Sequence, residues 1–140
     1  MPLEVADRFS PRTQRAFVER VVSAVCDHVA RPELEVSLLL TDDEEIARLH
    51  GEFMNDPTPT DVMSFEIDNG AEVVVSVETA RRTAKAAGHS MRAEVALYIV
   101  HGILHTVGYD DVAPDDRVRM REAERAIMKQ LRLRVREVDA

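Results

Sequence analysis

The sequence predicts a single α+β domain over residues 1–140, with a small mixed sheet of about four strands packed with helices around one buried central helix. Three observations support this prediction. The length of 140 residues and the 45% hydrophobic content fit one ordinary globular domain. Helical apolar spacing alternates along the chain with short strand-like stretches. One segment, residues 95–104, is apolar on nearly every helical face, which is typical of a buried helix.

The first part of the chain predicts a helix, a strand and a second helix. Valines recur at helical spacing within residues 11–29, so we expect an amphipathic helix that ends near Pro32. Residues 34–40 alternate and then become fully apolar, as in a half-buried or central strand. The Thr-Asp-Asp-Glu segment at 41–44 is typical of a capping box and predicts a helix to about Phe53.

Two strands and a helix are expected next. Residues 61–67 alternate apolar and polar side chains, and an apolar run at 73–75 follows the turn sequence Asp-Asn-Gly at 68–70. This pattern predicts a hairpin. The Ala-rich segment 77–87 predicts a helix, with Gly88 placed to cap its carboxyl end.

The chain is expected to end with two further helices. Ser90 is placed to cap the buried helix, and Pro114 is typical of a helix start. In the last helix, we expect four residues to face the core and the arginines to face solvent. The four core residues are Val118, Ala123, Ile127 and Leu131.

Composition excludes several classes of protein. The single cysteine, Cys26, cannot form an internal disulfide, which fits a reducing compartment. The first residues lack the basic start and apolar run of a secretory signal. The longest uncharged stretch, residues 95–109, is too short to cross a bilayer. We therefore expect a cytoplasmic protein that does not bind membranes.

Charge is unevenly distributed. The net charge is −8, yet residues 117–136 hold eight basic residues against two acidic ones. Such a run is most often a solvated helix face, but it also suits a polyanionic partner. Composition alone does not choose between these interpretations.

The buried helix carries a pattern typical of a metal site. His101 and His105 are four residues apart and so share one helix face. Gly108 can adopt a positive φ and turn the chain, which would bring Asp111 back toward the imidazoles. Two imidazoles and a third donor are what a three-ligand metal site with an open position requires. Asp110 is an alternative third ligand, because adjacent acidic residues cannot be ranked by spacing.

Two families carry similar spacing. Metzincin proteases have a catalytic glutamate at the position of Gly102, so their general base is missing here. The segment 101–111, His-Gly-Ile-Leu-His-Thr-Val-Gly-Tyr-Asp-Asp, more closely resembles the signature of the YbeY family of bacterial rRNA maturation factors, with Asp111 in place of a final histidine. Segment 59–65, Pro-Thr-Asp-Val-Met-Ser-Phe, also resembles a family motif, and the overall resemblance extends from about residue 34 to residue 128.

The YbeY resemblance implies a metal-dependent single-strand endoribonuclease. It would act in 16S rRNA 3′-end maturation and ribosome quality control, with single-stranded rRNA, the small ribosomal subunit and its proteins as partners; DNA is not expected. The implied ligands are His101, His105 and Asp111, binding one Zn²⁺ per chain. Because Asp111 replaces a histidine, Mn²⁺ or Fe²⁺ would also suit the site. Three arginines of the last helix would contact RNA: Arg117, Arg121 and Arg125.

The remaining candidates have weaker support. The general acid and base are not identified; Asp61 and Ser64, on an edge strand, are weak catalytic candidates. Glu94 precedes His101 by seven residues on the same helical stripe and is a candidate for orienting a ligand imidazole. Met54 stands where some family members have an arginine.

The departures from the family pattern at Met54 and Asp111 favour a first rival function, and the metzincin-like spacing suggests a second. One is a ribosome-assembly factor that binds RNA or protein and whose metal is mainly structural. The other, which Gly102 disfavours, is a zinc metalloprotease.

Overall fold

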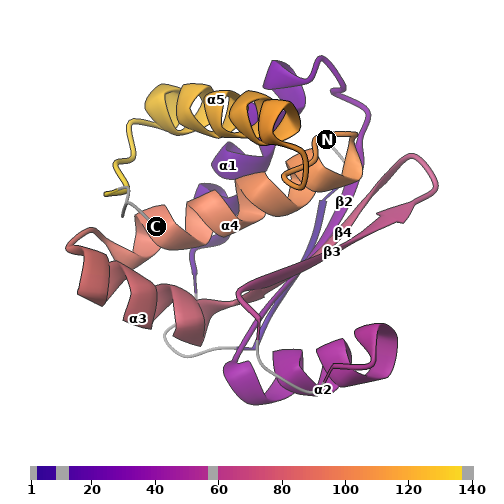
Figure 1. Ribbon diagram of the computed structural model, residues 1–140, viewed down its shortest axis with the longest axis vertical. Coiled ribbons are helices and arrows are strands. Elements are labelled where there is room, and N and C mark those ends of the chain that lie inside the picture. Colours follow the sequence, from indigo (N-terminus) through magenta and orange to yellow (C-terminus); the bar gives the residue numbers. More distant parts are fainter. Residues whose placement is uncertain (1–2, 9–12, 57–59, 137–140) are drawn as a thin grey trace.

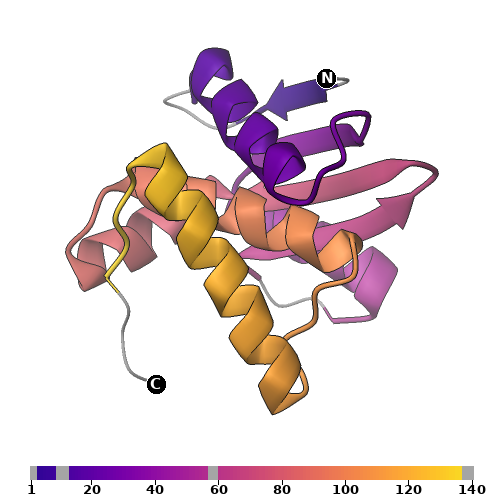
Figure 2. The same ribbon diagram turned by 90° about the horizontal axis from the view of Figure 1, so that it is seen from above.

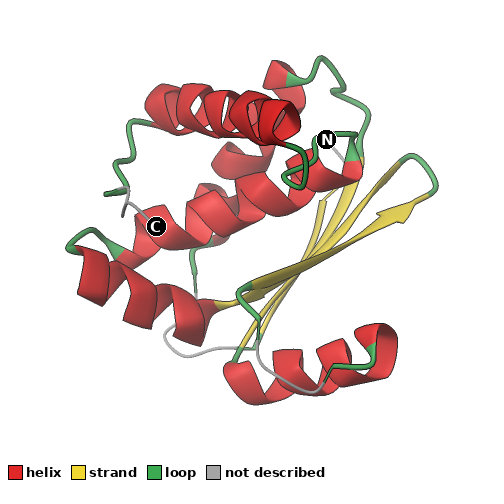
Figure 3. Cartoon of the chain, viewed as in Figure 1, coloured by secondary structure: helices red, strands yellow, loops and turns green. Residues whose placement is uncertain are grey.

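The computed structural model describes residues 3–8, 13–56 and 60–136, and it has the predicted α+β architecture (Figures 1 and 3). One mixed sheet of four strands and five helices make up the described part of the chain. Pro59, in the second motif, lies outside the described residues.

The sheet has the strand order β1-β2-β4-β3. Strand β1 (Leu3–Asp7) pairs in parallel with β2 (Glu35–Thr41), which pairs in parallel with β4 (Gly70–Ser76). The predicted hairpin is confirmed: β3 (Val62–Ile67) runs antiparallel to β4 and forms an edge of the sheet. No sequence pattern above predicts β1, because its five residues are only partly buried and lack an apolar run.

Helices cover the two faces of the sheet unequally. Figure 1 shows α1 (Arg15–His28), α4 (Met91–Thr106) and α5 (Pro114–Leu131) on one side of the sheet and α2 (Asp43–Met54) on the other. Helix α3 (Val77–Ala87) packs beside α4. Figure 2 shows α5 lying across α4, so that α4 lies between α5 and the sheet. The predicted buried helix is thus confirmed as α4.

Helix boundaries follow local capping chemistry. Helix α3 ends at Gly88 with φ of 84°, and Ser90 accepts a hydrogen bond from the Ala93 amide at the start of α4, both as predicted. The cap of α2 is one residue later than a Thr41 capping box requires. Asp42 accepts the bond from the Glu45 amide, and the Thr41 hydroxyl instead donates to the Glu45 carboxylate.

The prediction that Val118 faces the core is wrong. Its exposed fraction is 55%, whereas Met120 is 1% exposed. Met120 shares a helix face with the correctly predicted core residues Ala123, Ile127 and Leu131, and Val118 lies about 200° away from it around the axis. Val118 therefore faces solvent, as do the arginines on either side of it.

Helix α4 approaches the sheet at Gly102. A Cβ atom at this position would lie 2.7 Å from Val73 Cγ1 and 3.2 Å from Val62 Cγ2. Because Gly102 has no side chain, α4 can lie close to strands β3 and β4. The same contact removes the space for the glutamate that metzincin proteases carry at this position.

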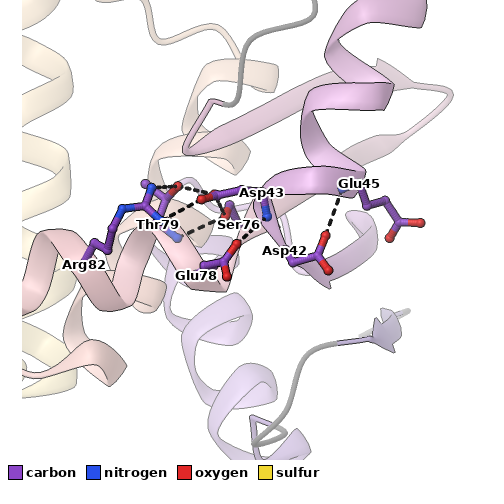
Figure 4. A network of polar contacts seen from close by, with 7 residues as sticks. All are labelled: Asp42, Asp43, Glu45, Ser76, Glu78, Thr79 and Arg82. Atoms are coloured by element: carbon purple, nitrogen blue, oxygen red, sulfur yellow. Dashed lines mark hydrogen bonds and ion pairs between the residues drawn. The ribbon is translucent and has the colours of Figure 1, made fainter.

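A polar network joins the amino-terminal ends of α2 and α3 (Figure 4). The Asp43 carboxylate accepts hydrogen bonds from Ser76 Oγ at 2.6 Å, Thr79 Oγ1 at 2.5 Å and Arg82 Nη1 at 2.6 Å. In return, the Asp43 amide donates to Glu78 Oε1 at 3.2 Å. Burial would raise the pKa of the Asp43 carboxyl, but these hydrogen bonds together outweigh burial and hold the pKa below its usual value.

Candidate active site

A hollow of about 410 Å³ lies where α4, α5 and the start of β3 meet. Its lining contains six of the residues that sequence reasoning selected, together with one carboxylate that it missed, Glu124. The six are Asp61, Glu94, His101, Asp111, Arg117 and Arg121. Residues from separate parts of the chain are therefore brought to one place.

His101 is fixed from two sides. Its Nδ1–H donates to Glu124 Oε2 at 2.7 Å, and its Nε2 lies 3.8 Å from Asp111 Oδ2. The hydrogen bond to Glu124 raises the pKa of His101, burial opposes that rise, and the charges of Glu124 and Asp111 add to it. An imidazole with Nδ1 bound to a carboxylate has its other nitrogen oriented for a ligand, as in many metal sites.

The loop after α4 brings Asp111 toward His101. Gly108 has a φ of 110°, so the predicted turn is confirmed. The Asp110 carboxylate accepts bonds from the amides of Asp111 and Val112 within this loop. Asp110 thus caps the loop, and of the two acidic residues Asp111 is the one that faces His101.

His105, the third candidate ligand, is not gathered with His101 and Asp111. It lies one helical turn after His101, and its side chain is exposed. Across the described residues, no three His, Cys, Asp or Glu side chains are gathered closely enough to hold a metal ion. The donor types suit a metal ion, and the structure brings together two of the three, His101 and Asp111.

Glu94 lies in the hollow but contacts a different histidine. Its Oε1 is 2.5 Å from Nε2 of His89, and both side chains are almost fully buried. The carboxylate that orients His101 is Glu124, so the role expected of Glu94 is wrong. Seven residues separate Glu94 from His101, about two turns and too far for a hydrogen bond, whereas α5 places Glu124 directly against the imidazole. No sequence signal links residues 101 and 124, which belong to different helices.

Of the two catalytic candidates, Asp61 and Ser64, one lines the hollow. Asp61 lines the hollow, where its carboxylate accepts a bond from the Val62 amide at 2.8 Å. Ser64 is half-buried on β3 and is not part of the lining. Met54 ends α2, is 51% exposed and also lies outside the lining.

The predicted RNA-contacting arginines lie along one helix. Arg117 and Arg121 line the hollow around His101, and Arg117 also donates to the Asp111 carbonyl oxygen. Arg125 lies one turn further on, in a second and larger hollow that shares Arg121. Positive charge therefore continues along α5 from the candidate metal ligands.

Comparisons with known proteins agree with this fold. A family model described as "Endoribonuclease YbeY" matches residues 4–132. Relatives of that name include one from Heliobacterium modesticaldum, 36% identical over 81% of this chain and 80% of its own, and one from Thermobifida fusca, 37% identical over 86% and 87%. The solution structure of TM1509 from Thermotoga maritima matches with a TM-score of 0.67 and 19% identity, covering 93% of this chain and 91% of that one, which supports the fold.

The family model and the relatives of that name show that the protein is an enzyme, a hydrolase of the endoribonuclease class. The chain belongs to the YbeY family. The resemblance noted in the sequence is therefore confirmed. None of the helices in the described ranges is long and apolar enough to cross a membrane.

Proposed function

We propose that this protein is a metal-dependent single-strand endoribonuclease that matures the 3′ end of 16S rRNA and acts in ribosome quality control. The observation that carries the proposal is the hollow in which His101, fixed by Glu124, faces Asp111 beside two arginines. The rRNA substrate rests on the resemblance of segments 59–65 and 101–111 to the family motifs.

His101, His105 and Asp111 would hold one divalent cation. Zn²⁺ suits two imidazoles and a carboxylate, and the carboxylate also makes Mn²⁺ or Fe²⁺ acceptable. When bound, such an ion would polarise a phosphodiester and lower the pKa of water at the site. Ligand chemistry and the spacing on α4 support His105 as the third ligand.

The protein's own side chains would bind and orient the substrate. Glu124 holds the His101 imidazole with Nε2 directed toward Asp111. The guanidinium groups of Arg117 and Arg121 are suited to bind a phosphate in the hollow. Asp61, on the wall formed by β3, is the candidate proton acceptor, and Ser64 is the weaker one because it does not line the hollow.

We place this activity in the cytoplasm, on the small ribosomal subunit and its proteins. The basic run at 117–136 supports an RNA partner within a chain of net charge −8. Because the body of the protein is acidic, we expect rRNA to approach the face that carries α5.

The test combines metal content with cleavage. We would measure bound metal by elemental mass spectrometry on untagged wild-type protein and on His101→Ala, His105→Ala and Asp111→Ala, with exposed His28→Ala as the matched control. Each protein would be incubated with an RNA that contains the 16S 3′ end and its precursor extension. About one metal per chain and extension cleavage are expected in wild type and His28→Ala, with both greatly reduced in the other variants.

Cleavage that survives both His101→Ala and metal removal would refute the proposed mechanism. A folded wild type that binds the RNA without cutting it, whatever its metal content, would favour the ribosome-assembly factor. That alternative draws support from the exposed His105, which is not gathered with the other two ligands in the described structure.

A further inference from the structure

A second hollow of about 760 Å³ continues from the candidate active site along the carboxyl-terminal half of α5. The two hollows lie side by side, because they share four lining residues: Glu94, Leu97, Arg121 and Glu124. The far wall is the segment 132–136, which follows α5 and turns back beside the end of α3 (Figure 1). We call this larger hollow the distal groove.

The distal groove is strongly basic. Six basic side chains line it, all of them exposed: Arg121, Arg125, Lys129, Arg132, Arg134 and Arg136. Its two carboxylates, Glu94 and Glu124, are already engaged by His89 and His101. Lys129, Arg132 and Arg134 form no ion pair with any residue that the structure describes. Their charge is therefore available to an anionic ligand.

The wall of the distal groove is held in place by buried contacts. Leu133 and Val135 pack against the hydrophobic core, so the arginines that alternate with them point away from it. The Arg136 amide donates to His89 Nδ1 at 2.9 Å, and His89 Nε2 is in turn 2.5 Å from Glu94. This chain of contacts from Glu94 through His89 to Arg136 anchors the basic segment beside the groove. It also assigns Glu94 a structural role that the sequence did not predict.

Two exposed arginines of this wall, Arg134 and Arg136, alternate with residues that pack on the core, and both line the groove. The lining also includes the apolar side chains of Leu97 and Met128, and the guanidinium groups around them are suited to bind phosphates.

We propose that the distal groove binds the backbone of single-stranded RNA on one side of the scissile phosphate. This inference rests on the proposed function and extends it from the reacting phosphate to its neighbours. The enzyme would then require a strand several nucleotides longer than the dinucleotide being cut. RNA reaching only the hollow around His101 would not contact Lys129, Arg132 or Arg134.

The test removes three charges from the groove and three from elsewhere. The groove variant is Lys129→Gln/Arg132→Gln/Arg134→Gln. The control variant, Arg15→Gln/Arg48→Gln/Lys85→Gln, has the same net charge, and its three positions are exposed and outside both hollows. Fluorescence anisotropy with labelled oligouridine measures the binding of a dodecamer and a trimer between about 50 and 200 mM salt, and circular dichroism checks folding.

For the groove variant, we expect dodecamer affinity to fall at least tenfold and the salt slope to decrease by about 2, since each lost phosphate contact contributes about 0.7. Trimer affinity and trimer cleavage should stay within about twofold, as should all values for the control variant. Equal losses in the two variants, or unchanged dodecamer binding by a folded groove variant, would overturn the proposal. So would a groove variant that binds RNA normally but loses affinity for ribosomal proteins.

The outcomes separate this inference from the proposed function. If the wild type binds the dodecamer through the distal groove but cuts no RNA, the inference stands and the nuclease proposal fails. If the groove variant cuts and binds the dodecamer as the wild type does, the nuclease proposal stands and the inference fails.

Discussion

At the scale of single residues, the site depends on one histidine held between two carboxylates. The His101 imidazole donates through Nδ1 to Glu124, which leaves Nε2 facing Asp111. A carboxylate at Nδ1 fixes the tautomer and raises the basicity of the other nitrogen. Glu124 is therefore a positioning residue, whose effect reaches the site through His101.

Replacing Glu124 with Gln should weaken metal binding without unfolding the protein. We expect a 10- to 100-fold loss of metal affinity, because the neutral amide no longer increases the basicity of His101. In metal-free protein, the pKa of His101 should also fall toward its ordinary value, measured by NMR titration. Glu122→Gln, an exposed site on the same helix, is the control; unchanged metal affinity in Glu124→Gln would contradict the assignment.

Gly102 is required for packing. In Gly102→Ala, the new Cβ would meet Val73 Cγ1 at 2.7 Å, so α4 or β4 must shift. We expect the free energy of unfolding to fall by about 1–3 kcal/mol, despite the higher helix propensity of alanine. Denaturant unfolding measures this value, and equal or higher stability in the variant would show that the contact relaxes freely.

At the scale of elements, α2 is attached to the rest of the fold by an apolar contact and by a polar one. Ile46 packs with Met63 and Val74 on the sheet face opposite α4. Asp43 binds Ser76, Thr79 and Arg82 at the start of α3. This polar junction fixes where β4 ends and α3 begins, and α3 in turn packs against α4.

The Asp43 junction should make stability depend on acid pH. The folded-state pKa of Asp43 is lowered, so its contribution is complete above the unfolded pKa of about 3.9 and is lost as pH falls through the folded value. Asp43→Asn should lower the free energy of unfolding by about 1–3 kcal/mol at pH 7, and by less below about pH 4. Denaturant unfolding across this range measures the difference. Exposed Asp27→Asn is the control, and a deficit that persists unchanged below the folded pKa would refute the mechanism.

At the scale of the whole molecule, the core is large enough to hold α4 without a metal ion. Ile99, Ile103 and Leu104 are fully buried between the sheet, α1 and α5. The proposed ligands lie outside this core: His105 and Asp111 are exposed, and His101 is half-buried. The fold and the proposed chemistry therefore depend on different residues.

Removing metal with a chelator should abolish RNA cleavage while leaving a cooperative unfolding transition. A ligand at 100 times its Kd stabilises the folded state by about 2.7 kcal/mol, so Tm should fall by only several degrees. Calorimetry with and without chelator measures this change. Loss of the cooperative transition on chelation would instead indicate a structural metal and favour the ribosome-assembly factor.

The local features of this protein follow from the sequence. Apolar periodicity predicts the five helices and three of the strands, and the backbone of Gly88 and the side chain of Ser90 fix helix ends, because such signals involve residues close along the chain. The motif spacing of segment 101–111 also indicates the family. Two details differ from the prediction. Met120 and not Val118 lies on the buried face of α5, and Asp42 and not Thr41 caps α2.

Only the tertiary structure decided what lies beside these motifs. The strand β1 forms because β2 offers an unpaired edge, and not because of its own apolar pattern. The pairing of His101 with Glu124, and of Glu94 with His89, depends on how α5 and the following segment pack against α4. The distal groove has the same origin, because its charges come from residues whose orientation is set by contacts between distant parts of the chain.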